Sequence, residues 1–468
     1  MGAFVRKSLT STEGARLAEE KDYKDYLNSR NRGLLLDGKN LALSPQDSFR
    51  HLAVMSNSGA GKTSRYIVNN VFHLAAGNNS IVVNDPKAEI YKYTSGYLKK
   101  QGYRIVYINP SEPEFSEGFN PFEEAMNDIE RSQLADIIMR AAMPKQDFWS
   151  EGATRFIRLF LRCLAINGQR QDGVNNLHNL YRLFLNFGQD GEALNTWVAR
   201  NSVLPNDLDD ESIVEEWVGL LTGHREGILS FIVNALTALK AMADTDMAKV
   251  TARSTFSLAD IRKEKTAIFF CVPARYATHY SFLSSMFFRS VFNACMREEA
   301  GRSTIPAYIL FDEAGHTPIP DFATTITTIR SYRVSISIIL QSISQLSALY
   351  SKHEAASIQG GISSYMTYGG SDEETTQFFQ NKAGMFRTTV EPHEFNRFEQ
   401  RINDHHLLQA SDIRTMNDDT ALFVSANRYP VMLRTYPYYK LLRYLWWYRK
   451  EPVALPGQEP ETLRRIEL

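Results

Sequence analysis

Apolar positions along the chain alternate between short continuous runs and longer helical patterns. Between residues 31 and 110 the runs HLAVM, IVVN and RIVYI are short, apolar and rich in β-branched residues, which predicts three strands. Residues 63–76 between the first two runs have apolar positions at helical spacing, and 89–101 predict a second helix that ends at Gly102. This part of the chain therefore predicts the order strand, helix, strand, helix, strand.

The pattern changes after Asn120-Pro121. Residues 122–250 are mostly helical in period and poor in strand signals, which predicts an all-helical insertion. Its clearest helix, at 148–165, has an apolar face and a basic face. The apolar face carries Phe156, Phe160 and Cys163 with Leu164, and the basic face carries Arg155, Arg158 and Arg162.

Apolar strands return after the helical block, separated mostly by helices. They are AIFFCV (267–272), AYILF (307–311), VSISIIL (334–340) and ALFVS (421–425). Such runs predict an α/β fold with a parallel-rich sheet covered on both faces and interrupted once by the insertion. The expected layout is a polar tail or fraying helix at 1–30, an α/β domain at 31–121, the all-α insertion at 122–250, the rest of the α/β domain at 251–440, and an aromatic and basic tail at 441–468.

Composition narrows the classes of protein. The chain has 52 Lys and Arg against 53 Asp and Glu, a net charge of −1, which excludes binding of nucleic acid by bulk charge but leaves room for a local basic channel. Cys163, Cys271 and Cys295 have neither metal-ligand nor CxxC spacing, which favours a reducing compartment. The sequence shows neither a signal peptide nor an apolar run of about 18 residues, so we expect a soluble chain or one held at a membrane by a partner.

The strongest local motif is SNSGAGKT at 56–63, which lies between a predicted strand and a predicted helix as a phosphate-binding loop does. Its glycines allow backbone N–H groups to turn toward phosphate oxygens, and the following helix N-terminus favours anions. The lysine would reach the β- and γ-phosphates, and the threonine hydroxyl would hold Mg²⁺. The first position of the GxxxxGK[ST] pattern is Ser56 instead of glycine. The expected nucleotide-binding residues are Ser58, Gly59, Ala60, Gly61, Lys62 and Thr63.

An acidic pair follows the predicted strand AYILF. Asp312 and Glu313 would lie at the carboxyl edge of the sheet, where open α/β sheets bind ligands. We expect Asp312 to hold Mg²⁺ through water and Glu313 to polarise the attacking water as a general base. The following DEAGH resembles a DEAH helicase box, but Gly315 breaks its spacing and no Ser-Ala-Thr motif follows. A superfamily-two helicase is therefore disfavoured.

Two further residues are candidates for catalysis. Arg330 falls on the helix after the acidic pair, where it could serve the site of a neighbouring subunit. Gln341 ends the strand VSISIIL, where it could contact the γ-phosphate or its water. A supplied arginine finger raises the rate by roughly 10³–10⁵.

Several segments in order resemble the TraG/TraD-like type IV coupling proteins of conjugation and type IV secretion. These segments are SNSGAGKT, NDPKAE (84–89), GYRIVYINP (102–110), ILFDEAGHTPIPDF (309–322), RSYR (330–333) and LQSISQLSALY (340–350), within a likeness that covers about 31–440. The resemblance implies a RecA-like P-loop ATPase with an inserted all-α domain that uses ATP and Mg²⁺ and acts as a homo-hexamer. It implies nucleotide and metal binding by Lys62 and Thr63, roles in hydrolysis for Asp312 and Glu313, an arginine finger at Arg330 and a sensor at Gln341.

The same resemblance implies partners. It implies single-stranded or relaxase-bound DNA, relaxosome proteins and components of a secretion channel. Coupling proteins often begin with membrane-spanning helices, so a chain without them is expected at the cytoplasmic face through a membrane-anchoring partner. Ala88 replaces the glycine of the family's D-P-K-G-E pattern, and the roles of Asp85 and Lys87 stay open.

Alternatives remain on sequence grounds. One is a chromosome-type DNA translocase of the FtsK/HerA kind, and another is a nucleotide-gated adaptor with little hydrolysis, which Ser56 leaves open. The aromatic and basic stretch 441–450 fits either a helix packed on the core or an interfacial helix. In a ring-shaped motor, basic side chains that face the pore would contact DNA. Candidates, which also fit solvated faces, are Arg155, Arg158, Arg162, Lys249, Arg253, Arg262, Lys263 and Lys265.

Overall fold

The computed structural model describes residues 9–143, 147–188, 190–202, 211–390, 401–455, 457 and 463–468. The chain divides into two compact units that interleave in sequence. Unit 1 comprises residues 1–79, 308–315 and 326–451, and unit 2 comprises 80–307, 316–325 and 452–468. Two of the boundaries between the units fall within η6 (Ala314–His316) and α13 (Phe322–Thr328). Each unit is therefore built from stretches that are far apart in the sequence.

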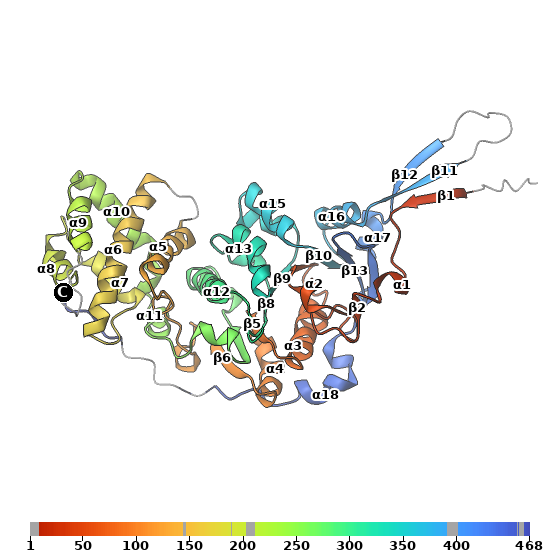
Figure 1. Cartoon of the computed structure of the whole chain (residues 1–468), viewed down its shortest axis with the longest axis horizontal. Coiled ribbons are helices and arrows are strands. Elements are labelled where there is room, and N and C mark those ends of the chain that lie inside the picture. The colour runs from red at the N-terminus through yellow and green to blue at the C-terminus, as the bar shows by residue number, and fades with distance from the viewer. Residues whose placement is uncertain are drawn as a thin grey trace, which may run out of the picture. The chain divides into compact units, whose positions relative to one another are not determined.

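Unit 1 is built on strands in the order β14-β13-β10-β4-β9-β8, of which Figure 1 labels β13, β10, β9 and β8. The central β10, β4 and β9 are parallel and entirely buried, while β13 and β14 add antiparallel at one side. Burial on both faces explains why β4 and β9 read as mostly apolar runs in the sequence. The strands are β4 (Leu52–Met55), β8 (Ala307–Phe311), β9 (Val334–Leu340), β10 (Ser364–Tyr368), β13 (Thr420–Ser425) and β14 (Val431–Arg434).

Unit 1 also contains several helical segments, most of them short. The helix after β4 starts as a π-helical turn, η1, and continues as α3. The helical segments are α1 (Glu20–Tyr23), α2 (Pro45–Ser48), η1 (Thr63–Ile67), α3 (Val68–Ala75), η7 (Ile329–Tyr332), α14 (Ser344–Leu349), α15 (Lys352–Gly361), α16 (Glu373–Ala383), α17 (Ala410–Arg414), η8 (Tyr438–Lys440) and α18 (Leu442–Tyr448).

Unit 1 also carries a small three-stranded sheet in the order β1-β11-β12, which Figure 1 shows projecting beside α16 and α17. Strand β1 (Leu9–Gly14) pairs antiparallel with β11 (Met385–Val390), which pairs antiparallel with β12 (Arg401–His406). The sequence predicts a tail or fraying helix here. The polar run LTSTEG instead forms a strand because distant residues supply its hydrogen-bonding partner. A short pair, β2 (Leu27–Asn28) and β3 (Ala42–Leu43), completes the strands described in this unit.

Unit 2 contains three parallel strands in the order β5-β7-β6. They are β5 (Ser80–Asn84), β6 (Arg104–Ile108) and β7 (Thr266–Phe270). Helix α4 connects β5 to β6 and ends before Gly102, whose φ of +82° is the left-handed conformation expected of a C-terminal cap. The neighbouring helical segments are α4 (Glu89–Lys100), η2 (Pro113–Phe115), η4 (Leu258–Arg262), η5 (Ala274–Tyr276) and α12 (Ser281–Met296).

Between η2 and η4 the regular elements of the described residues are all helical. These are α5 (Asp128–Ala142), α6 (Phe148–Arg170), α7 (Leu177–Leu185), α8 (Glu192–Arg200), α9 (Glu211–Leu221), α10 (Arg225–Ala238), η3 (Lys240–Ala243) and α11 (Thr245–Val250). The predicted apolar face of α6 is buried, and Phe156 and Phe160 pack against Trp217 with ring centroids 6.2 and 5.8 Å away. The inserted all-helical region is confirmed, while the proposed domain boundaries stay predictions.

Two segments join the helical region to the strands of unit 2. Residues 117–124 leave β6 and residues 250–260 return toward β7. The backbone N–H of Thr255 donates to the carbonyl of Gly118 at 3.1 Å, and the N–H of Gly118 donates to the Thr255 hydroxyl at 3.0 Å. A Cβ at Gly118 would lie 2.2 Å from the carbonyl oxygen of Arg253, so glycine is needed where the two backbones meet.

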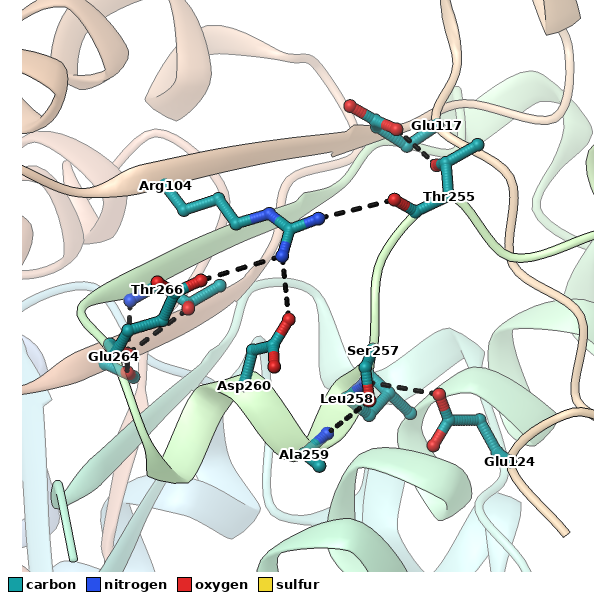
Figure 2. Close-up of polar contacts among 11 residues, drawn as sticks. Arg104, Glu117, Glu124, Thr255, Ser257, Leu258, Ala259, Asp260, Glu264 and Thr266 are labelled. Carbon is teal, nitrogen blue, oxygen red and sulfur yellow. Dashed lines mark hydrogen bonds and ion pairs between the residues drawn. The ribbon is translucent and has the colours of Figure 1, made fainter. Parts of the chain in front are cut away.

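Polar side chains reinforce this junction (Figure 2). The guanidinium of Arg104, on β6, donates to the Asp260 carboxylate at 2.7 Å and to the Thr255 carbonyl at 3.3 Å. The Glu124 carboxylate accepts from the Leu258 N–H at 3.1 Å, at the beginning of η4. The two connections are thus cross-linked by hydrogen bonds, which satisfy backbone groups that lie outside regular ladders.

The sequence-predicted strands and helices of the α/β core are present, and the α/β fold class is confirmed. The pattern missed β10 and β14, whose short sequences SYMTY and VMLR mix polar with apolar residues. In the part of the chain described, no helix has both the length and the apolar character needed to cross a bilayer.

Candidate nucleotide-binding site

The loop 56–61 joins the end of β4 to η1 in unit 1. Gly59 and Gly61 have φ values of +88° and +82°, which L-residues with a side chain rarely adopt. The Arg65 N–H donates to the Gly61 carbonyl at 2.7 Å and begins the helix. The N-cap of η1 is Lys62, and no side chain caps this helix among the described residues. The loop thus has the local geometry of a phosphate-binding turn.

Lys62 folds back over the loop. Its ammonium donates to the carbonyl of Ser56 and, at 2.9 Å, to the carbonyl of Asn57. The Asn57 amide donates in turn to the carbonyl of Gly370, just after β10. Sequence reasoning missed Gly370, which has φ of +80°, although the pair Gly369-Gly370 is a local signal of a turn. The loop is therefore held from the neighbouring strand, and its lysine lies close to its own backbone.

Ser56 occupies the position where the motif usually has glycine. Ser56 is fully buried, and its backbone N–H donates to the Leu340 carbonyl at 3.2 Å. Its hydroxyl is buried without a hydrogen-bond partner in the described structure. The substitution therefore leaves the loop backbone in register with β9, at the cost of one unpaired hydroxyl.

The predicted acidic pair lies beside the loop. Asp312 follows β8, is 9% exposed, and accepts a hydrogen bond from the Thr63 hydroxyl at 3.2 Å. Burial, with a smaller contribution from the nearby Glu313 carboxylate, raises the pKa of Asp312 to about 6. Glu313 has φ of +53°, and its N–H donates to the Asp312 carboxylate at 3.1 Å. The structure thus brings together the loop threonine and both acids, which the sequence separates by 249 residues.

Gln341 also lies at this edge, because β9 is parallel to β4 and Leu340 pairs in register with Met55. The Gln345 side chain accepts a hydrogen bond from the Gln341 N–H at 2.7 Å. A Cβ at Gly315 would lie 2.4 Å from the Gln345 side chain. Gln345 therefore fills the space beside the glycine that breaks the DEAH-like pattern. Sequence reasoning quoted Gln345 within a motif but gave it no role.

Arg330 lies elsewhere. It is exposed on η7, which precedes β9, whereas the phosphate loop lies beyond the other end of that strand. A seven-residue strand spans roughly 20 Å, so the guanidinium cannot reach the loop of its own chain. The structure therefore gathers the loop, the acidic pair and Gln341, and it separates Arg330 from them.

The NDPKAE segment begins α4 in unit 2. Asp85 is buried and its carboxylate accepts from the Tyr91 N–H at 2.8 Å, in the first turn of the helix. Ala88 has φ of +53°, the left-handed conformation that glycine adopts at least cost. A local role for Asp85 that the sequence did not reveal is thus to hold the start of the helix.

The candidate DNA-binding residues of unit 2 are partly engaged by acids. Arg162 pairs with Glu216 at 3.3 Å, and Arg158 lies 3.9 Å from Asp136, whereas Arg155 is exposed. The other candidates lie between residues 249 and 265. Lys249 pairs with Asp246 at 3.7 Å, and the Lys265 ammonium lies 4.6 Å from the Tyr103 ring centroid. Arg262 and Lys263 line a pocket of about 460 Å³, and Arg253 is exposed. Their contact with DNA stays a prediction.

Curated relatives are distant but cover most of the chain. VirD4 proteins from Rhizobium rhizogenes and Agrobacterium fabrum (strain C58 / ATCC 33970) are each 23% identical, over 88% and 89% of the chain. A conjugal transfer protein TraG from Rhizobium radiobacter is 20% identical over 88% of the chain. The chain spans 62% of the length of the two VirD4 relatives and 65% of that TraG.

Solved structures share the fold at low identity. The coupling protein TrwBdeltaN70, in an unbound monoclinic form, has a TM-score of 0.68 at 14% identity and covers 93% of this chain and 95% of its own. TrwB in complex with ADP and Mg²⁺ has a TM-score of 0.65 at 15% identity, covering 98% of both chains. This likeness confirms the predicted RecA-like P-loop fold. The profile of the family described as Type IV secretory system Conjugative DNA transfer matches residues 8–463, and the chain belongs to that family.

Proposed function

We propose that the chain is an ATP-hydrolysing motor that delivers a DNA–relaxase substrate to a type IV secretion channel. The observation that carries the proposal is the convergence of the phosphate loop, the Thr63–Asp312 hydrogen bond at 3.2 Å and Gln341 at one sheet edge. Membership of the conjugative DNA transfer family supports the substrate and the channel. A solved relative in the same fold was obtained with ADP and Mg²⁺, which supports the choice of ligand.

Phosphate binding is assigned to the loop 58–63. The positive φ values of Gly59 and Gly61 suit a backbone that turns its N–H groups toward an anion. The Lys62 ammonium exchanges the carbonyls of Ser56 and Asn57 for phosphate oxygens when nucleotide binds. This exchange requires little movement of the backbone, since the ammonium already lies over the loop.

The residues at the acidic pair suit a magnesium ion. Mg²⁺ prefers oxygen ligands, and the Thr63 hydroxyl and the Asp312 carboxylate are both oxygen donors. A pKa of about 6 for Asp312 is typical of a buried carboxyl group that has no cation beside it, and a bound cation would favour the ionised form. Thr63 would hold the ion directly and Asp312 through water, and the bound ion would neutralise charge on the transferred phosphoryl group.

Hydrolysis is assigned to Glu313 and Gln341. The Glu313 carboxylate accepts the proton of the attacking water, and the Gln341 amide contacts the γ-phosphate or that water. Gln345 acts as a positioning residue, since its side chain accepts from the Gln341 N–H. The Glu313→Gln variant is expected to bind ATP normally and to lose about 10²–10⁴ in turnover, because a positioned base contributes that range. Parent-level hydrolysis by this variant would refute the base assignment.

Arg330 suggests that catalysis is shared between copies of the chain. Its exposed position beyond the opposite end of β9 suits a finger donated to a neighbouring subunit in a ring. A homo-hexamer with sites at its interfaces is therefore proposed as the active form. A mixture of Lys62→Ala and Arg330→Ala variants tests it. The first lacks a working site but can donate Arg330, and the second keeps a site but cannot donate.

ATP turnover measured against protein concentration, with and without single-stranded DNA, tests the whole proposal. We expect cooperative, DNA-stimulated turnover in the parent, loss in each single variant and partial recovery in the mixture. A mixture as inactive as its components would exclude a shared finger. Absence of turnover in the parent, with relaxase binding retained, would favour the nucleotide-gated adaptor. Directional movement along double-stranded DNA would favour the FtsK/HerA kind of translocase.

A further inference from the structure

The C-terminal helix α18 of unit 1 has two chemically different faces. Its inner face is aromatic and packed, since Tyr444 and Trp447 contact Phe72 of α3 with ring centroids 5.1 and 5.6 Å away. Tyr444 is 2% exposed. Of the two expectations for residues 441–450, a helix packed on the core is therefore confirmed, but for one face of the helix only.

The outer face exposes large apolar side chains. Leu442 is 82% exposed and Trp446 is 80% exposed, the highest values among the large apolar residues described. Tyr439, on the preceding η8 turn, is 49% exposed. The spacing of four residues puts Leu442 and Trp446 on one side of α18. Full exposure of a tryptophan beside a leucine is costly in water, which points to an apolar environment in the functional state.

Basic residues surround this apolar face. Lys440, Arg443 and Arg449 are exposed, and Lys450 is half-buried. Between residues 436 and 451 the sequence contains one acid, Glu451. Arg443 is oriented by the fold, because its guanidinium donates to the Gly38 carbonyl at 2.9 Å and lies 4.5 Å from the Tyr444 ring centroid. An exposed apolar stripe with a basic border is complementary to a surface that is apolar inside and anionic outside.

We propose that the face formed by Tyr439, Leu442, Trp446 and the basic residues 440, 443, 449 and 450 binds an anionic lipid surface. Leu442 and Trp446 insert at the level of the lipid headgroups, where tryptophan is favoured because its ring is apolar and its N–H is polar. The lysine and arginine side chains contact lipid phosphates. The contact is peripheral, and it requires neither a spanning helix nor ATP hydrolysis.

The face is tied to the helix that follows the phosphate loop. The Arg65 guanidinium donates to the Thr435 carbonyl at 3.0 Å, and the Asn69 amide donates to the Tyr436 carbonyl at 2.7 Å. Direct hydrogen bonds therefore attach the segment before α18 to η1 and α3. A lipid contact at α18 would hold this helix, and with it unit 1, at the membrane.

Flotation with lipid vesicles tests the proposal on the full chain. We expect binding to vesicles of phosphatidylcholine and phosphatidylglycerol in equal parts, and at least about tenfold weaker binding to phosphatidylcholine alone. Leu442→Ala should weaken binding several-fold, and Lys440→Glu with Arg449→Glu should weaken it by roughly fivefold or more per charge. Added salt should weaken binding of the parent, because exposed charges are screened.

Matched variants separate this face from general stickiness. Ile129→Ala, at a 72% exposed site in unit 2, and Lys240→Glu, at another exposed site there, should leave vesicle binding unchanged. Trp446→Phe should keep binding but abolish the blue shift of tryptophan emission that vesicles cause. Thermal unfolding of each variant checks that the fold is intact. Failure of the parent to bind anionic vesicles, equal binding to neutral ones, or normal binding by the Leu442 and charge-reversal variants would each overturn the proposal.

Discussion

Two junctions of the chain share the order strand, loop, helix but differ in what occupies the helix N-terminus. After β5, the carboxylate of Asp85 accepts the Tyr91 N–H in the first turn of α4. After β4, no described side chain caps η1, and the loop is made of residues that allow close approach of the backbone. The first junction is completed by the chain's own anion, and the second suits an anion from outside.

The backbone shows the same contrast. Gly59 and Gly61 supply positive φ in the phosphate loop, whereas Ala88 adopts φ of +53° at the other junction despite its side chain. A helix N-terminus attracts negative charge in both cases. The lesson is that a turn before a helix suits an external anion only when no internal carboxylate already satisfies the helix N-terminus.

The largest expected effect separates the two junctions by nucleotide affinity. Lys62→Ala should weaken ATP binding by roughly a hundredfold, because charge-assisted bonds to phosphate are lost. Asp85→Ala should leave ATP affinity unchanged within twofold and lower the free energy of unfolding by about 1–3 kcal/mol, because the Tyr91 N–H loses its acceptor. Isothermal titration with an ATP analogue and urea unfolding measure the two quantities.

Asp85→Asn is the matched control, since an amide oxygen can still accept the Tyr91 N–H. It should restore most of the stability lost in Asp85→Ala. The contrast between the junctions would fail if Asp85→Ala lost nucleotide affinity while its unfolding midpoint stayed at the parent value.

These junctions also show where sequence reasoning works. The loop 56–63 and the pair Asp312-Glu313 were predictable because each lies beside a strand with a strong local pattern. The Asn57–Gly370 hydrogen bond joins residues 313 apart, and no local pattern specifies such a pair. Gln345 likewise looks like an ordinary polar residue until the fold puts it against Gly315. Local chemistry is encoded locally, whereas the support for it depends on tertiary contacts.

The same strands differ at their beginnings, and this difference predicts a pH dependence. β5 begins at Ser80, whose hydroxyl donates to the Glu264 carbonyl at 2.9 Å and does not titrate. β4 begins after His51, which is 1% exposed and accepts from the Ile336 N–H at 3.1 Å through Nδ1. Burial lowers the pKa of His51 to about 4, with a smaller contribution from the charge of Arg330.

Because His51 has a lower pKa in the folded chain than its unfolded value of 6.5, the unfolded chain binds the proton more tightly. The folded state therefore keeps its full stability above pH 6.5 and loses it as the pH falls toward 4. The loss at pH 4 should be about 3 kcal/mol for His51 alone. His51→Asn should flatten this part of the profile, because asparagine tolerates the φ of +63° and its oxygen can accept the Ile336 N–H. Urea unfolding at a series of pH values from 7 down to 4 measures the loss. An equally steep acid loss in the variant would assign the dependence to other groups.

The smallest expected effect tests the backbone half of the contrast. Ala88→Gly should raise the free energy of unfolding by up to about 1 kcal/mol, because the left-handed conformation costs alanine more than glycine gains in unfolded-state entropy. Gly59→Ala should lower it by a similar amount, although a Cβ there would meet nothing within 4 Å. The two changes exchange the same pair of residues in opposite directions, both at positive φ, so their effects should have opposite signs. If Ala88→Gly instead destabilises the chain, contacts of the Ala88 methyl group outweigh the backbone cost, and the alanine is there for packing.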